Sequence, residues 1–353
     1  MRNLAQSLMG IAGAAVMALP LAFPVQAQSA AEDEPLTTLQ EVIARGRLTC
    51  GVNGNLAGFA SVDANQVWSG FEVEFCRALA AAVLGDPSLV DVVALPALDR
   101  FVPLRDGQID VIARASGWSL LPDAQNGVNM VAISFYDQLG FLVPATLGIT
   151  SGKELDDAVI CHVASVAVAN SLDDYFRAAG LAYTTLVVQS DQYARQSYLS
   201  DECDSYARTA SELYAVRASF ETPSDHLIIS EPASRLPSGP VVREGDDDWA
   251  DVVRWTFYAL LAAEELGVTS ANVREMAATP VANPETNRLL GTEGSFGEML
   301  GLRSQWAVDA IAAGGNYAEI FERHIGESTP VGIARGLNAI WTRGGLQYAP
   351  PFR

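Results

Sequence analysis

The hydrophobic positions in the first third of the chain follow two spacings in turn, that of a strand and that of a helix. Short apolar runs at 47–52, 91–95 and 108–113 predict three strands. Apolar residues three and four positions apart predict a helix over 70–85 that ends at a glycine, and a helical turn at 100–104 precedes the third strand. Strands that alternate with helices pair in parallel, so this region predicts an α/β sheet.

The same alternation restarts after an extended segment at 140–143, which predicts a crossing into a second unit of the same kind. A return crossing at 239–242 ends this unit, and a long helix follows over 248–266. Two α/β units joined by two extended crossings form a clamshell with a cleft between its lobes, a common place for a ligand. The second unit is predicted to contain strands at 158–163, 184–188, 204–207 and 227–230, a short helix at 153–157 and a longer one at 171–179.

Residues 1–27 have the pattern of a secretory signal peptide. Arg2 supplies a positive charge, 8–23 is almost entirely apolar, and Val25-Gln26-Ala27 is a small-x-small cleavage site. The alternative is an N-terminal membrane anchor, which Pro20 and Pro24 disfavour because they interrupt the apolar run. We therefore expect the mature protein to be exported and soluble.

The net charge of −20 makes nucleic acids and anionic lipid surfaces unsuitable partners, because both are themselves negative. Four cysteines, an even number, suggest disulfides in an exported protein, with three possible pairings and buried free thiols as the alternative. The sequence has no Cys-x-x-Cys motif and its three histidines are scattered, so we expect no zinc site and no cofactor.

One short stretch, DVIARASGWSLLPDA at 110–124, has the pattern of a binding edge. Its apolar start predicts a buried strand, which opens into the small residues Ala115, Ser116 and Gly117 before Trp118. Small residues after a buried strand allow the backbone to approach a ligand closely. We call residues 115–119 the lip of the predicted cleft.

Seven blocks spread over the chain resemble one known family. They are TLQEVIARGRLTCGVNGNLAGF, WSGFEVEFCRALAAAVLGDPS, DRFVPLRDGQIDV, EGDDDWADVVRWTFYALLAAEELGVTSANV, LLGTEGSFGEMLGL, GNYAEIFERHIG and GLNAIWTRGGLQYAPPFR. These blocks are similar to periplasmic solute-binding proteins, in particular the general L-amino-acid-binding component of polar-amino-acid ABC importers. The resemblance implies an α/β type II clamshell, in which each lobe is a mixed, mostly parallel sheet flanked by helices, with a helical C-terminal extension.

The resemblance also implies how the chain is divided and what it does. Lobe 1 is expected at 28–141, lobe 2 at 142–238, and a return to lobe 1 with the C-terminal extension at 239–353. One disulfide is expected within each lobe, Cys50–Cys76 and Cys161–Cys203, so that the hinge stays free. By the same resemblance, the protein is a periplasmic monomer that binds a small solute and presents it to an ABC permease, and it is not an enzyme.

The residues that grip an amino acid in this family are replaced at the matching positions of this chain. The arginine for the α-carboxylate falls on Pro122, and the lip has Ala115 and Gly117 where polar side chains are usual. In lobe 2, Ser165-Val166-Ala167 occupies the position where the family has a Gly-Thr-Thr turn. Thr209 occupies the position of the aspartate that binds the ammonium in the family. Burying an unpaired charge costs several kcal/mol, so we expect the ligand to differ from a polar amino acid.

The remaining side chains at matching cleft positions form the candidate site. Three of them have an alternative role: Phe59 in the core, Trp118 in packing the lip, and Arg114 in a scaffold ion pair. Arg208, beside the replaced aspartate, is a candidate contact for an anion. The candidate ligand-binding residues are Asn53, Phe59, Arg114, Ser116, Trp118, Ser119, Ser165, Arg208 and Thr209.

These residues favour a binding protein for an apolar or weakly polar solute, or for a carboxylate that lacks the amino group. Three alternatives stay open. The first is a polar L-amino-acid binder with shifted site residues. The second is a dehydratase-like enzyme of the same fold, which needs Glu212 or Asp123 as a general acid with a raised pKa. The third is a docking or sensor protein without a ligand.

Overall fold

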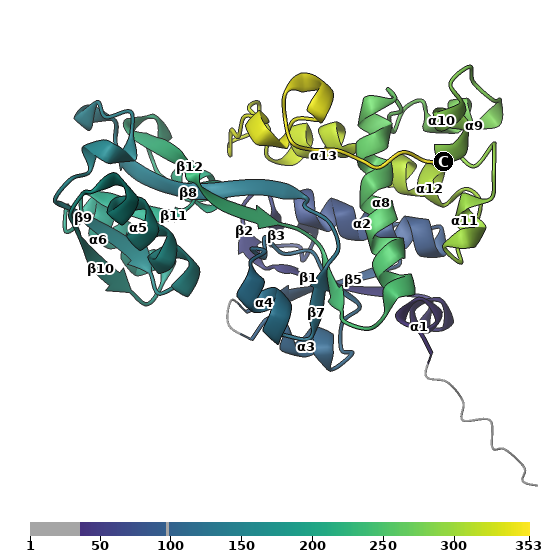
Figure 1. The fold of residues 1–353 in the computed structure, drawn as a ribbon, viewed down its shortest axis with the longest axis horizontal. Coiled ribbons are helices and arrows are strands. Elements are labelled where there is room, and N and C mark those ends of the chain that lie inside the picture. Colours follow the sequence, from purple (N-terminus) through teal and green to yellow (C-terminus); the bar gives the residue numbers. More distant parts are fainter. Residues whose placement is uncertain (1–35, 97–98) are drawn as a thin grey trace, which may run out of the picture. The chain divides into compact units, whose positions relative to one another are not determined.

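The structure is a computed structural model that describes residues 36–96 and 99–353 (Figure 1). The predicted signal peptide at 1–27 lies outside the described residues. Among the helices that are described, none is long and apolar enough to cross a membrane. The strands form two sheets of five strands each and a smaller sheet of three.

The first sheet consists, in spatial order, of β5 (Val90–Leu95), β1 (Leu48–Asn53), β6 (Val111–Ile112), β13 (Val241–Arg243) and β7 (Val128–Met130). β1 pairs in parallel with β5 and β6, as the alternation of strands and helices predicts. β13 arrives from far along the chain and pairs antiparallel with β6 and β7. The sheet is therefore mixed, with a parallel half formed by the first three strands.

The second sheet consists, in spatial order, of β10 (Tyr183–Val188), β9 (Ala158–Val163), β11 (Ser205–Thr209), β8 (Phe135–Pro144) and β12 (His226–Ser238). β9 pairs in parallel with β10 and β11. β8 is antiparallel to both β11 and β12. The two sheets thus have the same plan, a parallel half extended by antiparallel strands.

The chain passes between the sheets twice, once where it enters β8 and once where it leaves β12, and these two long strands pair with each other (Figure 1). Residues 140–143, which the sequence predicts as a crossing, lie inside the second sheet, where they pair with β11 and β12. That prediction is wrong because an extended crossing and a strand have the same local pattern. The first passage lies earlier, where the Ser134 N–H donates to the Ser238 carbonyl of the return passage at 2.8 Å. The lobe boundaries implied by the resemblance stay a prediction.

The first sheet is supported by α2 (Phe71–Leu84) and α8 (Asp247–Glu265), against which α12 (Trp306–Gly314) and α13 (Tyr317–His324) pack. α2 ends at Gly85 with φ 83°, a conformation that glycine adopts without strain, as predicted. The apolar faces of these helices and of the first sheet share one large buried cluster. This core is the rigid support from which the loops after β1 and β6 project.

Three helices of the second sheet depart from the sequence prediction. α5 (Val166–Ala179) begins five residues before the predicted helix, because the Ser165 hydroxyl caps it by accepting the Val168 N–H. α6 (Asp191–Leu199) and α7 (Ala210–Ala218) are not predicted, since few of their residues are apolar and buried. The other helices and the strands of the small sheet are α1 (Thr38–Arg45), α3 (Val102–Arg105), α4 (Leu120–Gln125), α9 (Val273–Ala278), α10 (Pro284–Leu289), α11 (Phe296–Met299), β2 (Asn55–Leu56), β3 (Ala60–Val62) and β4 (Trp68–Ser69).

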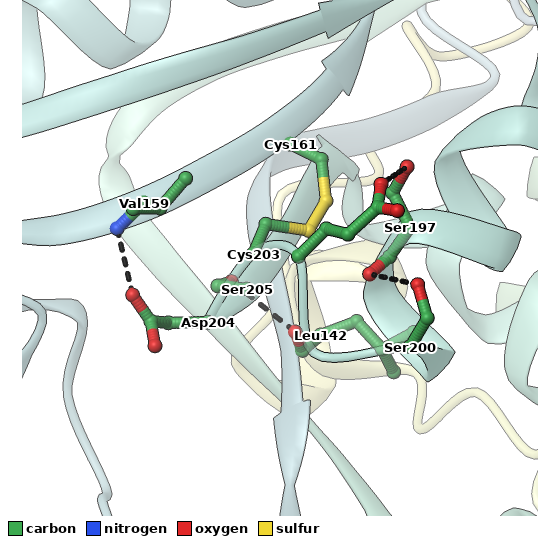
Figure 2. Close-up of a disulfide and its surroundings, with 9 residues drawn as sticks. Leu142, Val159, Cys161, Ser197, Ser200, Cys203, Asp204 and Ser205 are labelled. Atoms are coloured by element: carbon green, nitrogen blue, oxygen red, sulfur yellow. Dashed lines mark hydrogen bonds between the residues drawn. A yellow bond between two sulfur atoms is a disulfide. The ribbon is translucent and has the colours of Figure 1, made fainter.

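Two disulfides join the cysteine pairs that the resemblance implies. Cys50 on β1 is bonded to Cys76 on α2, with their Cα atoms 6.0 Å apart. Cys161 on β9 is bonded to Cys203, just before β11, with their Cα atoms 5.7 Å apart (Figure 2). Each bridge lies within one sheet and its helices, so neither bridge links the two sheets.

The second disulfide is surrounded by hydrogen bonds that hold the start of β11 in place (Figure 2). The Asp204 carboxylate accepts the Val159 N–H at 2.8 Å, which links the residue after Cys203 to β9. The Ser205 hydroxyl donates to the Leu142 carbonyl at 3.2 Å, which links the same segment to β8. The bridge therefore reinforces a segment that is already tied to both neighbouring strands.

Candidate functional site

A cleft of about 1240 Å³ is lined by residues from both sheets. The first sheet contributes the loops after β1 and β6, and the second contributes the start of α5, the end of β11 and α7. Loops at the carboxyl ends of parallel strands are where open α/β sheets bind ligands. The predicted site residues that the cleft brings together are Asn53, Arg114, Ser165, Arg208 and Thr209.

The other four predicted residues do not line this cleft. Phe59 is 1% exposed and packs edge-to-face against Phe135, with ring centroids 5.4 Å apart, so it occupies the core. Within the lip, Ser116 is buried, whereas Trp118 and Ser119 are exposed. A large aromatic side chain next to a sheet is more stable in the core, which is the alternative that Phe59 follows.

The buried carboxyl group of Glu72 links the loop after β1 to the loop after β6 by hydrogen bonds. It lies in the first turn of α2 and is 6% exposed. Its carboxylate accepts the Ala115 N–H at 2.5 Å and the Asn53 N–H at 3.5 Å, so it bridges the lip and the loop after β1. Burial raises the pKa of Glu72 to about 7, because desolvation outweighs the two backbone N–H groups and the positive Arg114.

The raised pKa of Glu72 predicts that the protein loses stability as the pH rises. The folded protein binds this proton more tightly than the unfolded chain, so the contribution is complete below the ordinary pKa of 4.5 and is lost as the pH passes through about 7. Its full size is at most about 3–4 kcal/mol, from about 1.4 kcal/mol for each pKa unit. Urea unfolding of the wild type and Glu72→Gln between pH 5 and pH 8 measures it.

The Gln side chain cannot titrate, so the variant should lack this part of the decline in the free energy of unfolding. The comparison isolates Glu72 from other buried carboxyl groups, which titrate in both proteins. Parallel pH profiles for the two proteins would show that the Glu72 pKa is not raised.

Arg114 follows β6 and lines the cleft from the first sheet. Its Nε atom is buried and has no hydrogen-bond partner among the described residues. Burial lowers the pKa of the guanidinium, although the carboxylates of Glu72 and Glu212 act in the opposite direction. A buried donor without a partner is costly unless a ligand supplies the acceptor. Arg114 is therefore suited to binding an anionic group that enters the cleft.

Arg208, from the second sheet, has its charge balanced by two carboxylates. It lies near the end of β11 and donates to Glu212 at 2.6 and 2.8 Å, and it forms an ion pair with Asp191. The Thr209 hydroxyl donates to the same Glu212 carboxylate at 2.8 Å. The role of Arg208 as a contact for an anion stays a prediction, since these internal partners compete with any ligand.

Arg208 and Thr209, which form a cluster with Glu212, also determine the pKa of the Glu212 carboxyl group. Burial would raise the pKa of Glu212, but the positive Arg208, its hydrogen bonds and the Thr209 hydroxyl outweigh burial and hold the pKa below its ordinary value. A general acid needs the opposite shift. Asp123, the other candidate acid, is exposed on α4 and does not line the cleft.

Asp137 is a cleft residue that the sequence analysis misses. It lies on β8, is 9% exposed, and accepts hydrogen bonds from the Ser211 N–H at 3.2 Å and from the Ser211 hydroxyl. Burial raises the pKa of Asp137 to about 6 in spite of these hydrogen bonds. An aspartate in an extended segment carries no signal of its own, and only the packing of β8 against α7 brings it to the cleft.

Relatives of known function establish the family. No family model matches the sequence. The glutamate/glutamine/aspartate/asparagine-binding protein BztA of Rhodobacter capsulatus is 49% identical over 317 residues, which cover 90% of this chain and 94% of that protein. The general L-amino acid-binding periplasmic protein AapJ of Rhizobium johnstonii is 44% identical over 342 residues, which cover 96% of this chain and 98% of that protein. The chain belongs to the amino-acid-binding periplasmic proteins of ABC transporters.

Solved structures of such solute-binding proteins confirm the type II fold. A periplasmic binding protein from Brucella ovis with glutathione bound is 45% identical, with a TM-score of 0.85 over 90% of this chain and 100% of that chain. The cysteine-binding protein from Campylobacter jejuni is 19% identical, with a TM-score of 0.54 over 65% of this chain and 89% of that chain, and shares the fold alone. Arg114 and the cluster around Arg208 thus line the cleft of a solute-binding protein, and Glu72 is hydrogen-bonded to Ala115 at its edge.

Proposed function

We propose that this solute-binding protein captures a solute that carries a carboxylate but needs no ammonium group, and presents it to an ABC permease. The observation that carries the proposal is the state of Arg114, a cleft residue whose buried Nε has no partner among the described residues. A carboxylate would supply the missing acceptor in a charge-assisted hydrogen bond, which is stronger than a neutral one. Arg208, by contrast, already has carboxylate partners.

The groups near the second sheet support the loss of ammonium recognition. Thr209 stands where the family has an aspartate, and its hydroxyl is used by Glu212. Both carboxylate oxygens of Glu212 accept hydrogen bonds from Arg208. An ammonium that lost its buried partner would forfeit about 2–5 kcal/mol, which is roughly 30- to several-thousand-fold in affinity.

Asp137 supports a second candidate function, the binding of a polar L-amino acid by shifted residues. Its carboxylate lines the cleft and becomes fully ionised above its pKa of about 6, so it offers an acceptor for an ammonium group. The printed names of the relatives favour the same candidate, since BztA is a binder of glutamate, glutamine, aspartate and asparagine. The two candidates differ in one chemical group of the ligand, the ammonium.

Titration calorimetry with 2-oxoglutarate and L-glutamate separates the candidates, because the two solutes differ only in the oxo or ammonium group on Cα. The protein is first unfolded and refolded to remove any solute carried through purification. We expect 2-oxoglutarate to bind at least tenfold more tightly than L-glutamate, since Arg114 offers a guanidinium whose Nε has no partner among the described residues, whereas the Asp137 carboxylate already accepts hydrogen bonds from Ser211. The dimethyl ester of 2-oxoglutarate, which lacks both carboxylates, is the control and should not bind.

Tighter binding of L-glutamate would refute the carboxylate proposal and support the amino-acid candidate. No heat and no thermal shift with either solute or with a wider panel would instead favour a protein that acts without a ligand.

We also propose that the chain is exported to the periplasm by the signal peptide at 1–27 and acts there as a monomer without catalysis. The periplasmic relatives support the compartment. The lowered pKa of Glu212 supports the absence of a general acid. Light scattering of the mature protein measures its mass and tests the monomer.

A further inference from the structure

The C-terminal segment 335–347, which we call the strap, grips the chain where it first passes between the sheets. Asn338 is 4% exposed, and its side chain accepts the Tyr136 N–H at 2.7 Å and donates to the Tyr136 carbonyl at 3.2 Å. These two bonds satisfy both backbone groups of Tyr136, as a neighbouring strand would. The strap thus takes the place of a sheet partner at the start of β8.

A second set of hydrogen bonds holds Ser134, which precedes β8 in the first passage. Gln347 is 2% exposed and donates through Nε2 to the Ser134 carbonyl at 3.2 Å. The Tyr317 hydroxyl of α13 donates to the same carbonyl at 2.9 Å. The strap itself is anchored to α8 by the ion pair of Arg335 with Glu264, at 2.9 Å. The first passage is therefore held against the helices that support the first sheet.

The return passage is fixed at the same place. The Ser134 N–H donates to the Ser238 carbonyl at 2.8 Å, so the two passages are bonded to each other. The Trp118 N–H of the lip donates to the neighbouring Pro237 carbonyl at 2.7 Å. Hydrogen bonds therefore connect the strap, both passages and the edge of the cleft in one continuous series.

The pairing of β8 with β12 becomes irregular just beyond this fixed region. Asp137 pairs with Leu236, whereas Leu139 pairs with Glu231. Residues 232–235 of β12 therefore lie opposite Gln138 alone, which is a bulge in the ladder. Two strands that are held on one side of a bulge can bend most easily at the bulge itself, because fewer ladder hydrogen bonds oppose the movement there.

We propose that the strap braces the hinge of this solute-binding protein and so controls solute affinity from outside the cleft. By holding Ser134 and Tyr136 to the helices that support the first sheet, it places the pivot of closure at the bulge around Gln138. The proposal rests on the capture of a solute by closure, but not on which solute is captured. A brace acts on the equilibrium between open and closed protein, so its loss changes the affinity for every solute by the same factor.

The test compares Asn338→Ala with Thr342→Ala, an exposed residue of the same segment, as the matched control. Hydrogen exchange should become faster at the Tyr136 amide only in Asn338→Ala, since that amide loses its acceptor. X-ray scattering of the solute-free variant should show a broader distribution of radii of gyration than the wild type and the control. Gln347→Leu, which breaks the separate bond to Ser134, repeats the test if Asn338→Ala does not fold.

Titrations with 2-oxoglutarate and L-glutamate complete the test. For each solute that binds, we expect a loss of affinity of about five- to a hundredfold, equal for both, from two lost hydrogen bonds of ordinary strength. Unequal factors would mean that Asn338 acts on the ligand contacts, and unchanged scattering and affinity would reduce the strap to ordinary packing. Either result overturns the proposal. If neither solute binds, the carboxylate proposal fails, while exchange and scattering still decide whether the strap is a brace.

Discussion

Arg114→Gln is expected to weaken the binding of 2-oxoglutarate by roughly 30- to several-thousand-fold, because it truncates a buried charged contact worth about 2–5 kcal/mol. The variant should fold as well as the wild type or better. Burial already disfavours the charged form of Arg114, and its Nε forms no hydrogen bond with the described residues that the substitution could break. Titration calorimetry measures the affinity, and thermal unfolding without solute measures the stability.

Arg105→Gln is the matched control for this prediction. Arg105 is an exposed arginine on α3 outside the cleft, so its removal changes the net charge by the same amount without touching the site. We expect less than a twofold change in affinity for this control, in keeping with a screened surface charge. Tight binding by Arg114→Gln would remove Arg114 from the site. Failure of the variant to fold would return Arg114 to the scaffold role that the sequence leaves open.

Removal of either disulfide is expected to lower the free energy of unfolding by about 4 kcal/mol, within a usual range of about 2–5 kcal/mol. The bridges close sequence separations of 26 and 42 residues, and the loss of loop-closure entropy in the unfolded chain is similar for both. The paired variants are Cys50→Ala with Cys76→Ala, and Cys161→Ala with Cys203→Ala. Guanidinium unfolding compares them with the wild type.

The position of each bridge within one sheet adds a second expectation. At temperatures where the variants stay folded, solute affinity should remain within about threefold of the wild type, because neither bridge spans the passages that bend. Ser200→Ala, an exposed residue near the second bridge (Figure 2), is the control and should change stability by less than about 0.5 kcal/mol. A large loss of affinity with little loss of stability would show that the bridges act on closure rather than on folding.

Much of the fold follows from local patterns in the sequence. The strand at 158–163 has the predicted bounds, and α2 ends at the predicted Gly85, because apolar spacing and a C-terminal glycine are local signals. The helices α6 and α7 are missed because few of their residues are both apolar and buried, and their stability comes from packing against the second sheet. The crossing at 140–143 is misplaced because strands and extended connections look alike until their partners are known.

Some residues of the candidate site could likewise be predicted from the sequence, and others could not. Asn53, Arg114, Ser165, Arg208 and Thr209 line the cleft, and the sequence analysis names them because they match cleft positions of the family that the chain resembles. Phe59 could equally be a core residue, and the packing around it decides for the core. Asp137 and the bridging role of Glu72 could not be foreseen, since both depend on contacts between segments far apart in the chain.

The sequence by itself determined the family, through the resemblance of its blocks, and the alternation of strands and helices, through the spacing of its apolar residues. The replacement of the charges that usually grip an amino acid stays a prediction. Only the tertiary structure decided which charges are satisfied within the protein. Arg208 and Glu212 balance each other, whereas the Nε atom of Arg114 is buried without a partner among the described residues. The physical reason is that desolvation and pairing depend on the atoms that surround a charge, and those atoms come from strands and helices that the sequence keeps far apart.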